Sequence, residues 1–242
     1  MKVSVITISQ HGRFPLLQLL LQHIQKQTVQ TDEWVIVEGS KTPEDAALHK
    51  ENIATLVATF PIRYLPYDGP VKLGGLRNRG NKACKGDIII CMDDDDYYPI
   101  DRIHHVLEQF RKYPNINIAG CSNVLLYDYS SKKLYQCVGF HGNHSTNNAM
   151  AWRSSYLTYH QHDDSKSNAE EASFTNSFSE KMIPLHPLKT VIVSSHTINT
   201  FDKRSLIESN PRFMLLPHSA LYTIMPEAVH KIYSDFFEMK RQ

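Results

Sequence analysis

The sequence predicts an α/β fold in which a mixed, mostly parallel sheet is flanked by helices. Short apolar runs rich in β-branched residues alternate with stretches of helical periodicity over residues 1–112. This alternation is typical of parallel strands joined by right-handed crossover helices. Four consecutive aspartates, Asp93–Asp96, follow the fourth apolar run, at a strand end where open α/β sheets bind ligands. A chain of 242 residues is long enough to form one large domain.

The elements of the first half follow from residue type and spacing. Apolar side chains at helical spacing, several of them preceded by proline or glycine, predict helices between the strands. The predicted strands are Val3–Ser9, Glu33–Glu38, Ile62–Leu65 and Ile88–Met92. The predicted helices are Phe14–Gln27, Pro43–Phe60, Leu73–Lys85 and Ile100–Lys112.

The second half is less regular, and we expect its strands to join the same sheet because no clean domain boundary separates the halves. A polar turn at Ser130–Lys133 predicts a hairpin between the strands on either side of it. Residues 161–169 are polar and predict a mobile loop. The predicted strands are Ile116–Ala119, Asn123–Tyr127, Leu134–Phe140 and Thr190–Val193, and the predicted helices are Ala169–Phe178 and Pro226–Lys240.

The acidic run Asp93–Asp96 is the strongest functional signal in the chain. Adjacent like charges stay ionised together only when solvent or a cation offsets them. Carboxylate oxygens are the ligands that Mg²⁺ and Mn²⁺ prefer. We therefore expect a divalent-metal site that holds a phosphate-bearing substrate. The alternative is a solvated acidic turn, and the strand Ile88–Met92 before the run and the helix start after Pro99 favour the metal site.

The composition excludes other classes of function. Lys and Arg number 26 and Asp and Glu 25, so the net charge of +1 gives no reason to expect nucleic acid as a partner. The four cysteines match no zinc pattern and indicate free thiols in a reducing compartment. No apolar stretch approaches the ~20 residues that cross a bilayer. We expect a cytoplasmic protein without a transmembrane segment, which meets any membrane-linked acceptor peripherally.

Five further residues have a functional and a structural interpretation each. Glu38 ends a predicted strand and is either a ribose or base contact or a turn acid. Arg77 follows Gly74-Gly75 and either binds a nucleotide or lies on the surface. Glu170 and Glu171 open a predicted helix, as dipole partners or as a general base. His196 follows a predicted strand and is either a metal or diphosphate contact or a structural histidine.

The order of these segments resembles glycosyltransferase family 2, the inverting transferases of the GT-A fold. The resemblance spans roughly residues 3–200 and is strongest over Leu73–Arg102. It is carried by the first strand, Glu38, Gly74–Asn78, the strand with its aspartate run, and the Glu170-Glu171 pair. It implies a metal-dependent GT-A enzyme formed by a single domain over 1–242. Its halves would be 1–112 for the nucleotide sugar and 113–205 for acceptor and catalysis, with a C-terminal helical extension over 206–242.

The resemblance assigns the donor and metal sites. Asp93 and Asp95 match the DxD motif, and Asp95 would coordinate Mn²⁺ or Mg²⁺ on the donor diphosphate. Asp93 would meet the ribose or the metal shell, and Asp94 would lie between donor sugar and phosphate. Glu38 and Arg77 fall where the family contacts the nucleoside. The remaining contacts implied are Ile8 and Ser9 in the nucleoside pocket and His196, followed by Asn199-Thr200, at the metal or diphosphate.

The resemblance also assigns the catalytic and acceptor sites. Glu171 falls on the base position of a motif that is commonly Glu-Asp, and this departure leaves open whether Glu170 or Glu171 is the base. Trp152 and Arg153 precede that motif, where the acceptor-side pocket of the family forms. Trp152 is otherwise expected to be a core aromatic residue.

The expected function is transfer of a sugar from a nucleotide-diphosphate sugar, UDP-linked, to a hydroxyl of a glycan or glycoconjugate acceptor. Two alternatives remain. One is a nucleotidyltransferase acting on a sugar phosphate, for which the usual glycine- and lysine-rich loop is missing. The other is a non-catalytic carbohydrate-binding derivative of the fold. UDP is the expected nucleotide of the donor, with GDP and dTDP as the alternatives.

Overall fold

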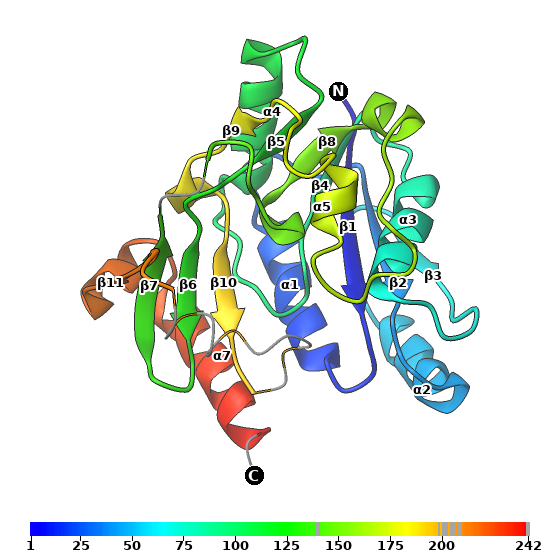
Figure 1. Ribbon diagram of the computed structural model, residues 1–242. Coiled ribbons are helices and arrows are strands. Elements are labelled where there is room, and N and C mark those ends of the chain that lie inside the picture. The colour runs from blue at the N-terminus through cyan, green and yellow to red at the C-terminus, as the bar shows by residue number, and fades with distance from the viewer. Residues whose placement is uncertain (139–140, 198, 200–202, 204–206, 208–209, 241–242) are drawn as a thin grey trace.

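The computed structural model describes residues 1–138, 141–197, 199, 203, 207 and 210–240. Two sheets form its framework (Figure 1). The larger has seven strands in the order β3-β2-β1-β4-β8-β5-β9, and the smaller has the order β10-β6-β7-β11. The α/β architecture with a mostly parallel large sheet confirms the predicted fold class.

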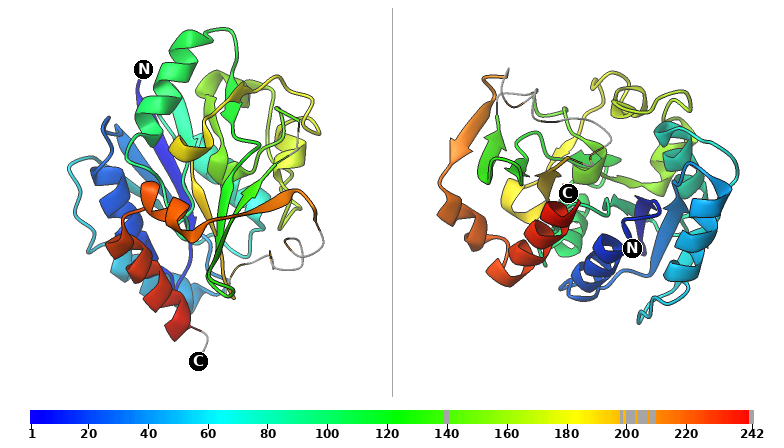
Figure 2. Two further views of the ribbon diagram at one scale, coloured as in Figure 1. Left: turned by 90° about the vertical axis from the view of Figure 1, so that its left-hand side faces the viewer. Right: turned by 90° about the horizontal axis from the view of Figure 1, so that it is seen from below.

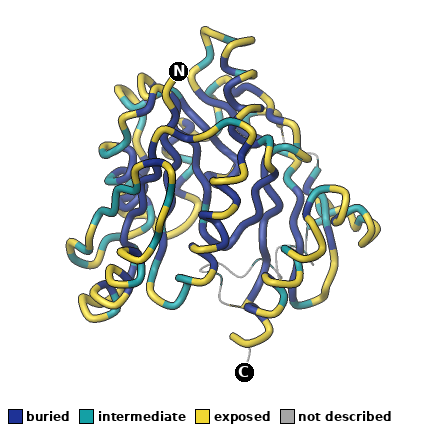
Figure 3. Tube along the Cα trace, turned by 180° about the vertical axis from the view of Figure 1, so that it is seen from behind, coloured by how far each residue is buried: buried dark blue, intermediate teal, exposed yellow. Residues whose placement is uncertain are grey.

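The first half forms as predicted. Strands β1 (Val3–Ser9), β2 (Glu33–Glu38), β3 (Ile62–Leu65) and β4 (Ile88–Cys91) are all parallel. The intervening helices are α1 (Phe14–Gln25), α2 (Pro43–Ile53), α3 (Leu73–Ala83) and α4 (Arg102–Lys112). Burial of β1, β2 and β4 is nearly complete, which explains their continuous apolar sequences (Figure 3).

Helix α2 is shorter than predicted. Its start is fixed by Thr42, whose side chain accepts a hydrogen bond from the Asp45 backbone N–H at 3.1 Å. The helix ends at Ile53 instead of Phe60. Phe60 is buried in the main core instead, just before β3. A helix that continued to Phe60 would leave no chain to reach the edge of the sheet where β3 begins.

The second half does not share one sheet, contrary to our expectation. Strands β8 (Ala151–Arg153), β5 (Ile118–Gly120) and β9 (Ile183–Pro184) extend the large sheet, and β8 runs antiparallel to β4 and β5. The others build the small sheet: β6 (Leu125–Asp128), β7 (Lys133–Cys137), β10 (Ile192–Ser195) and β11 (Phe213–Leu216). The predicted hairpin is confirmed as antiparallel β6–β7. The predicted strand end at Gly139-Phe140 lies outside the described residues.

The predicted helix over Ala169–Phe178 is a single turn, α5 (Glu171–Phe174). Ala169, two residues before it, has a φ of 51°, and three successive residues after it, Asn176–Phe178, have φ between 49° and 61°. Left-handed backbone cannot continue a right-handed helix. The apolar spacing of Phe174 and Phe178 therefore does not correspond to a helical face.

The loop over residues 161–169, predicted to be mobile, is fixed to α3. The Asn78 side chain donates to the backbone carbonyl of His162 at 2.8 Å and accepts from the His162 N–H at 2.9 Å. It also donates to Asp164 Oδ1 at 2.7 Å. The Gly74 N–H donates to the carbonyl of Lys166 at 3.0 Å. A Cβ on Gly74 would lie 2.0 Å from the backbone oxygen of Asp163, so the glycine permits this close approach.

Helix α7 (Glu227–Met239) packs beside α1, as both views in Figure 2 show. Their contact forms a second core, in which Leu16 and Leu19 meet Tyr233, Phe236 and Phe237. The apolar spacing of the C-terminal segment predicted this helix, and the packing explains the spacing. The C-terminal helix thereby covers the flank of α1 that carries Leu16 and Leu19.

Candidate active site

The acidic run lies where the two sheets meet. β4 ends at Cys91, and the chain then passes through the aspartates to Tyr97, whose backbone exchanges two hydrogen bonds with Ile192 of β10 at 2.9 and 3.1 Å. β1 and β10 end at the same lower edge in Figure 1. Asp94, Asp95 and Asp96 are buried, which excludes the solvated acidic turn. Each aspartate has a different set of partners.

Arg13 brings a positive charge into this cluster. Its Nη1 lies 2.9 Å from Asp94 Oδ1 and 3.0 Å from Asp95 Oδ2. Burial raises the pKa of Asp94 to about 6, and the Asp95 charge adds to that effect while Arg13 opposes it. Arg13 was not among the predicted site residues. Its place in the loop after β1, at the same edge of the sheet, was the available signal.

Asp95 and His196 are in direct contact. His196 Nε2 lies 3.2 Å from Asp95 Oδ2, and the Asn199 amide lies 3.4 Å from the same oxygen. Burial opposes ionisation of Asp95, but Arg13 and the hydrogen bond from His196 outweigh it and hold the pKa well below its usual range. Burial lowers the pKa of His196. The structure thus brings two predicted metal contacts together. Thr200, predicted beside them, lies outside the described residues.

Asp96 has a structural set of contacts. Its Oδ1 accepts the Ser194 backbone N–H at 2.7 Å, and its Oδ2 accepts the Asn148 amide. The Tyr233 hydroxyl of α7 donates to the Asp96 carbonyl at 2.7 Å. Burial and the neighbouring Asp95 raise the pKa of Asp96 to about 7. This last aspartate connects the end of the run to β10 and α7.

Arg77 connects the acidic run to the glutamate pair. Its guanidinium binds both Asp93 oxygens, at 2.7 and 3.1 Å, and its Nε lies 3.5 Å from Glu170 Oε1. It also donates to Cys91 Sγ at 2.9 Å. Arg77 is only 4% exposed, so it is not the surface arginine of the structural interpretation. The predicted contact of Arg77 with the nucleoside stays a prediction, because the guanidinium N–H groups donate to Asp93, Cys91 and Glu170 in this structure.

Glu170 and Glu171 differ in their surroundings. Glu170 is buried and accepts hydrogen bonds from Arg77 and from the Asn147 amide, the latter at 3.0 Å. Glu171 opens α5 and is half-buried. Burial and the Glu170 charge raise the pKa of Glu171 to about 7. A carboxylate with a pKa near neutrality has the properties of a general base.

Glu38 is buried, and both oxygens of its carboxylate accept hydrogen bonds. It accepts from His49 Nδ1 at 2.8 Å, from the Tyr64 hydroxyl at 2.7 Å and from the Ser40 N–H at 2.9 Å. Burial opposes its ionisation, but these hydrogen bonds prevail and lower the pKa of Glu38. Ser9 pairs with Glu38 in the sheet and lies 3.4 Å from His49 Nε2. Ile8, the other predicted nucleoside contact, is half-buried at the same strand end.

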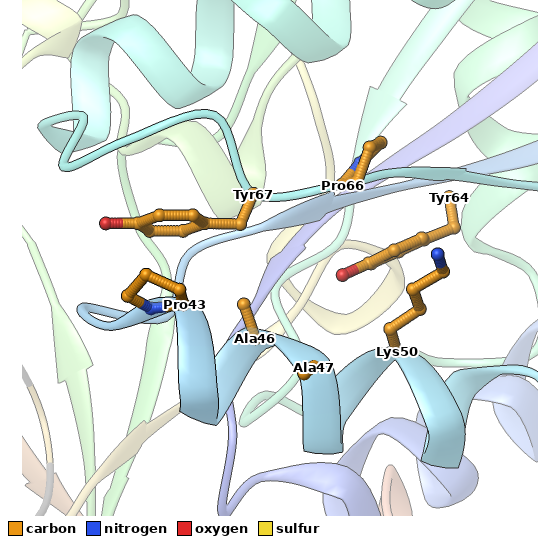
Figure 4. A pocket seen from close by; sticks show the side chains of 7 residues that line it. All are labelled: Pro43, Ala46, Ala47, Lys50, Tyr64, Pro66 and Tyr67. Atoms are coloured by element: carbon orange, nitrogen blue, oxygen red, sulfur yellow. The ribbon is translucent and has the colours of Figure 1, made fainter.

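A pocket of about 220 Å³ lies next to this network, between α2 and the end of β3 (Figure 4). Tyr64 belongs to both, because its ring faces the pocket and its hydroxyl donates to Glu38. A second pocket, of about 530 Å³, lies on α7. Neither is lined by the acidic run or the glutamate pair. The pocket lining is Pro43, Ala46, Ala47, Lys50, Tyr64, Pro66 and Tyr67 in the first, and Tyr222, Glu227, Ala228, His230, Lys231 and Ser234 in the second.

Trp152 and Arg153 do not lie at the acidic run. Trp152 is fully buried and packs against Phe174, with ring centroids 4.9 Å apart, so the structure favours its core interpretation. Arg153 pairs with Ile88 at the start of β4, whereas the aspartates follow the end of that strand. Because β8 runs antiparallel to β4, Arg153 lies at the end of β8 that is farther from the aspartates. The placement of these residues gives no support to the predicted acceptor contacts.

The predicted metal ligands assemble in part. Among the described residues, no three His, Cys, Asp or Glu side chains form a cluster with metal-binding geometry. Asp95 and His196 are together, whereas Asp93 faces Arg77. Mg²⁺ and Mn²⁺ commonly use one or two carboxylates and complete their shell with phosphate and water. Asp94 Oδ2 is buried and has no hydrogen-bond partner in the described part of the chain. This oxygen-rich set therefore fits a divalent cation.

Comparison with known proteins identifies the family. The family model described as "Glycosyl transferase family 2" matches residues 4–172, and the chain belongs to this family. YwdF of Bacillus subtilis (strain 168), an uncharacterized glycosyltransferase, is 28% identical over 109 residues, which are 45% of this chain and 38% of that protein.

Solved structures show that the fold is GT-A. The mannosyltransferase PcManGT from Pyrobaculum calidifontis, in complex with GDP-Man and Mn²⁺, aligns with a TM-score of 0.61 and 13% identity, over 82% of this chain and 58% of that one. S. aureus TarS 1–349 in complex with UDP-GlcNAc aligns with a TM-score of 0.56 and 15% identity, over 98% and 71%. The alignment covers only 37% of a longer TarS chain.

Two further expectations concern thiols and membranes. None of the four cysteines forms a disulfide; Cys91, Cys121 and Cys137 are buried and Cys84 is half-buried. Of the helices in the described ranges, none combines the length and apolar character that a bilayer span requires.

Proposed function

We propose that this chain is an inverting, metal-dependent glycosyltransferase that moves a sugar from a UDP-linked donor to a hydroxyl of a glycan or glycoconjugate. One observation carries the proposal: the Arg77 guanidinium contacts both Asp93 of the acidic run and Glu170 of the glutamate pair. The acidic group assigned to the donor and the residue next to the proposed base Glu171 therefore contact the same side chain. Family membership supports the same reaction.

The donor end is assigned to residues 1–112. Asp95 with His196 would hold Mn²⁺ or Mg²⁺, and Asp93 and Asp94 would face the ribose, sugar and phosphate. The cation, when bound, offsets the charge that develops on the diphosphate leaving group. Arg13 contributes positive charge at the same place, 3.0 Å from Asp95 Oδ2. Glu38, Arg77, Ile8 and Ser9 are assigned to the nucleoside end.

The catalytic end is assigned to residues 113–205, with Glu171 as the base. Glu170 is occupied by Arg77 and Asn147, whereas no hydrogen bond from another side chain to the Glu171 carboxylate occurs among the described contacts. The acceptor hydroxyl would give its proton to Glu171 as its oxygen attacks the anomeric carbon. The bond from that carbon to the diphosphate breaks with its electron pair, and one displacement inverts the configuration. No covalent nucleophile is needed.

Structural relatives support a nucleotide-sugar donor, because one was solved with GDP-Man and Mn²⁺ and another with UDP-GlcNAc. Calorimetry with UDP and with GDP, each with and without Mn²⁺, would identify the nucleotide and the need for metal. Asp95→Ala should abolish the Mn²⁺-dependent part of binding. Glu171→Gln should keep that binding and lose most release of nucleotide from the donor.

Three results would overturn the proposal. Unchanged binding of UDP with Mn²⁺ by Asp95→Ala would remove Asp95 from the metal site. Formation of pyrophosphate from a nucleoside triphosphate and a sugar phosphate would identify a nucleotidyltransferase. Binding of saccharide with no turnover of any nucleotide sugar would identify a carbohydrate-binding derivative.

A further inference from the structure

His162 and Asn147 form a chain of hydrogen bonds that ends on Glu170. We propose that both are positioning residues, which hold Glu170 as a fixed carboxylate beside the base Glu171. The proposal rests on the function proposed above and deepens it. It assigns a role to two buried polar residues that lie outside the acidic run, 15 residues apart in sequence.

The hydrogen bonds lead from His162 through Asn147 to Glu170. His162 Nε2 lies 2.9 Å from Asn147 Oδ1, and Asn147 Nδ2 lies 3.0 Å from Glu170 Oε1. Arg77 Nε approaches the same Glu170 oxygen at 3.5 Å. His162, Asn147 and Glu170 are 0%, 2% and 3% exposed, so water does not compete for these bonds.

Chemistry fixes the donor and acceptor at each step. A carboxylate only accepts, so the Asn147 NH₂ must face Glu170 and its oxygen must face His162. The His162 ring then donates from Nε2. The neutral ring suffices for this, and burial, with the nearby Arg77 charge, lowers the pKa of His162 to about 3. The ring is held by stacking on Phe174, at 4.1 Å and 7° between planes.

The backbone of His162 is fixed as well. Asn78 on α3 binds both its N–H and its carbonyl, at 2.9 and 2.8 Å. The neighbouring residue on α3, Arg77, contacts Glu170 directly. Helix α3 therefore sets the position of Glu170 by two routes, one through Arg77 and one through His162 and Asn147.

Packing alone does not explain the histidine. Its Nδ1 is buried and has no hydrogen-bond partner within the described residues, which is costly in an apolar place next to Trp152 and Phe174. A phenylalanine would stack on Phe174 equally well without that cost. The polar contact that His162 makes instead is the one to Asn147, and it leads to Glu170.

The charged groups that face Glu171 are Glu170, adjacent in sequence, and Arg77 from α3; the backbone N–H of Asn147 also faces its carboxylate. Glu170 raises the pKa of Glu171, and Arg77 and the N–H lower it. Without the hydrogen bond from Asn147, Glu170 is no longer held in place beside Glu171, and the repulsion that raises the pKa of Glu171 weakens. The pKa of Glu171 should then fall.

The test uses His162→Phe and Asn147→Ala in the full chain. His160→Phe is a matched control, because His160 also stacks on an aromatic ring, Tyr156 at 3.8 Å, and its Nε2 contacts an acid, Glu180 at 3.1 Å. Carboxyl ¹³C NMR titration of Glu171 measures its midpoint without any substrate. The ratio of UDP release from UDP-GlcNAc with Mn²⁺ at pH 6 and pH 8 gives a second readout.

We expect the Glu171 midpoint to fall by about one pH unit in His162→Phe and in Asn147→Ala, and to stay in place in His160→Phe. The pH 6 to pH 8 rate ratio should rise in the first two variants, while the KM for UDP-GlcNAc is unchanged. His162→Gln, which restores an N–H donor, should recover part of the shift. A merely structural defect would lower the rate equally at both pH values.

An unchanged midpoint in both folded variants would overturn the proposal, as would the same shift in His160→Phe. Should one of the two variants fail to fold, the other decides. If no nucleotide sugar is turned over by the unmodified protein, the proposed function fails, but the NMR titration still decides whether His162 and Asn147 position Glu170.

Discussion

Arg77 and Asp93 face each other in a bidentate ion pair, with Nη1 2.7 Å from Oδ1 and Nη2 3.1 Å from Oδ2. The same guanidinium reaches Glu170, and burial leaves it almost no contact with solvent. Burial alone would lower the pKa of Arg77, but Asp93 and Glu170 raise it well above its ordinary value. The planar, permanently charged fork of arginine suits this place between two carboxylates.

Removal of Arg77 should therefore be costly. We predict that Arg77→Met lowers the free energy of unfolding by about 3 kcal/mol, because it leaves Asp93 and Glu170 without their cation. Arg77→Lys should cost less but still lose the bidentate geometry. Urea unfolding measures both. Arg79→Met, on the same helix, should have a small effect, because the contact of Arg79 with the Pro66 carbonyl is exposed. Equal effects at the two positions would contradict the bridging role.

The rate should depend on the ionisation of Glu171. A base acts only when deprotonated, and burial together with Glu170 raises the pKa of Glu171 to about 7. We predict that kcat rises with pH, is half-maximal near pH 7, and falls about tenfold per pH unit well below it. Measuring release of UDP from the donor between pH 5.5 and 8.5 tests this. A flat profile over that range would remove Glu171 from the role of base.

The same shift makes Glu171 a destabilising residue at neutral pH. Its folded-state pKa exceeds the ordinary value of 4.5, so the folded protein binds the proton more tightly than the unfolded chain. Stability from this group is therefore lost as pH rises from about 4.5 to 7. Glu171→Gln should raise the free energy of unfolding by about 1 kcal/mol at pH 8 and have little effect at pH 4. Urea unfolding at both pH values measures the difference, and identical effects would refute it.

The sequence predicted the first half of the fold because its signals are local. Each strand from β1 to β4 is a short apolar run, and a proline, glycine or capping residue lies near the start of several of the helices. The acidic run was predictable at the sheet edge for the same reason. The small sheet was not predictable, because nothing local in β6 or β10 records which strand lies beside it.

Side chains that join distant segments were also missed. Arg13, Asn147 and His162 are single polar residues without a motif, and their roles depend on contacts across 81, 23 and 15 residues of sequence. Trp152 had two interpretations in the sequence, as a contact for a sugar ring and as a core aromatic residue. The antiparallel β8 buries its ring in the core, which only the arrangement of the strands decides.

Gly74 is expected to tolerate no side chain. Alanine normally stabilises a helix by about 1 kcal/mol relative to glycine. Here a Cβ would lie 2.0 Å from the backbone oxygen of Asp163, so the loop over 161–169 must move. We predict that Gly74→Ala lowers the free energy of unfolding by about 2 kcal/mol and speeds hydrogen exchange at His162. Gly142→Ala is the control, because a Cβ there meets nothing within 4 Å. A stabilising Gly74→Ala would contradict the close approach.

His23 should destabilise the protein in acid. It is buried on α1, with its ring 5.0 Å from that of Tyr97, and neither ring nitrogen has a hydrogen-bond partner among the residues described. Burial, with the nearby Lys26, lowers the pKa of His23 to about 3. The unfolded chain takes up this proton as pH falls below the ordinary value of 6.5, and the folded protein does not, so stability is lost as pH falls from 6.5 towards 3.

His23→Phe removes the group that takes up a proton on unfolding, and it keeps an aromatic ring beside Tyr233 of α7. We predict a gain in the free energy of unfolding of about 2 kcal/mol at pH 5 and about 1 kcal/mol at pH 8, where only the unsatisfied nitrogens matter. Urea unfolding at both pH values measures the gains. His104→Phe, at an exposed position of α4, should show neither. A gain that is independent of pH would mean that the folded protein protonates His23 as readily as the unfolded chain.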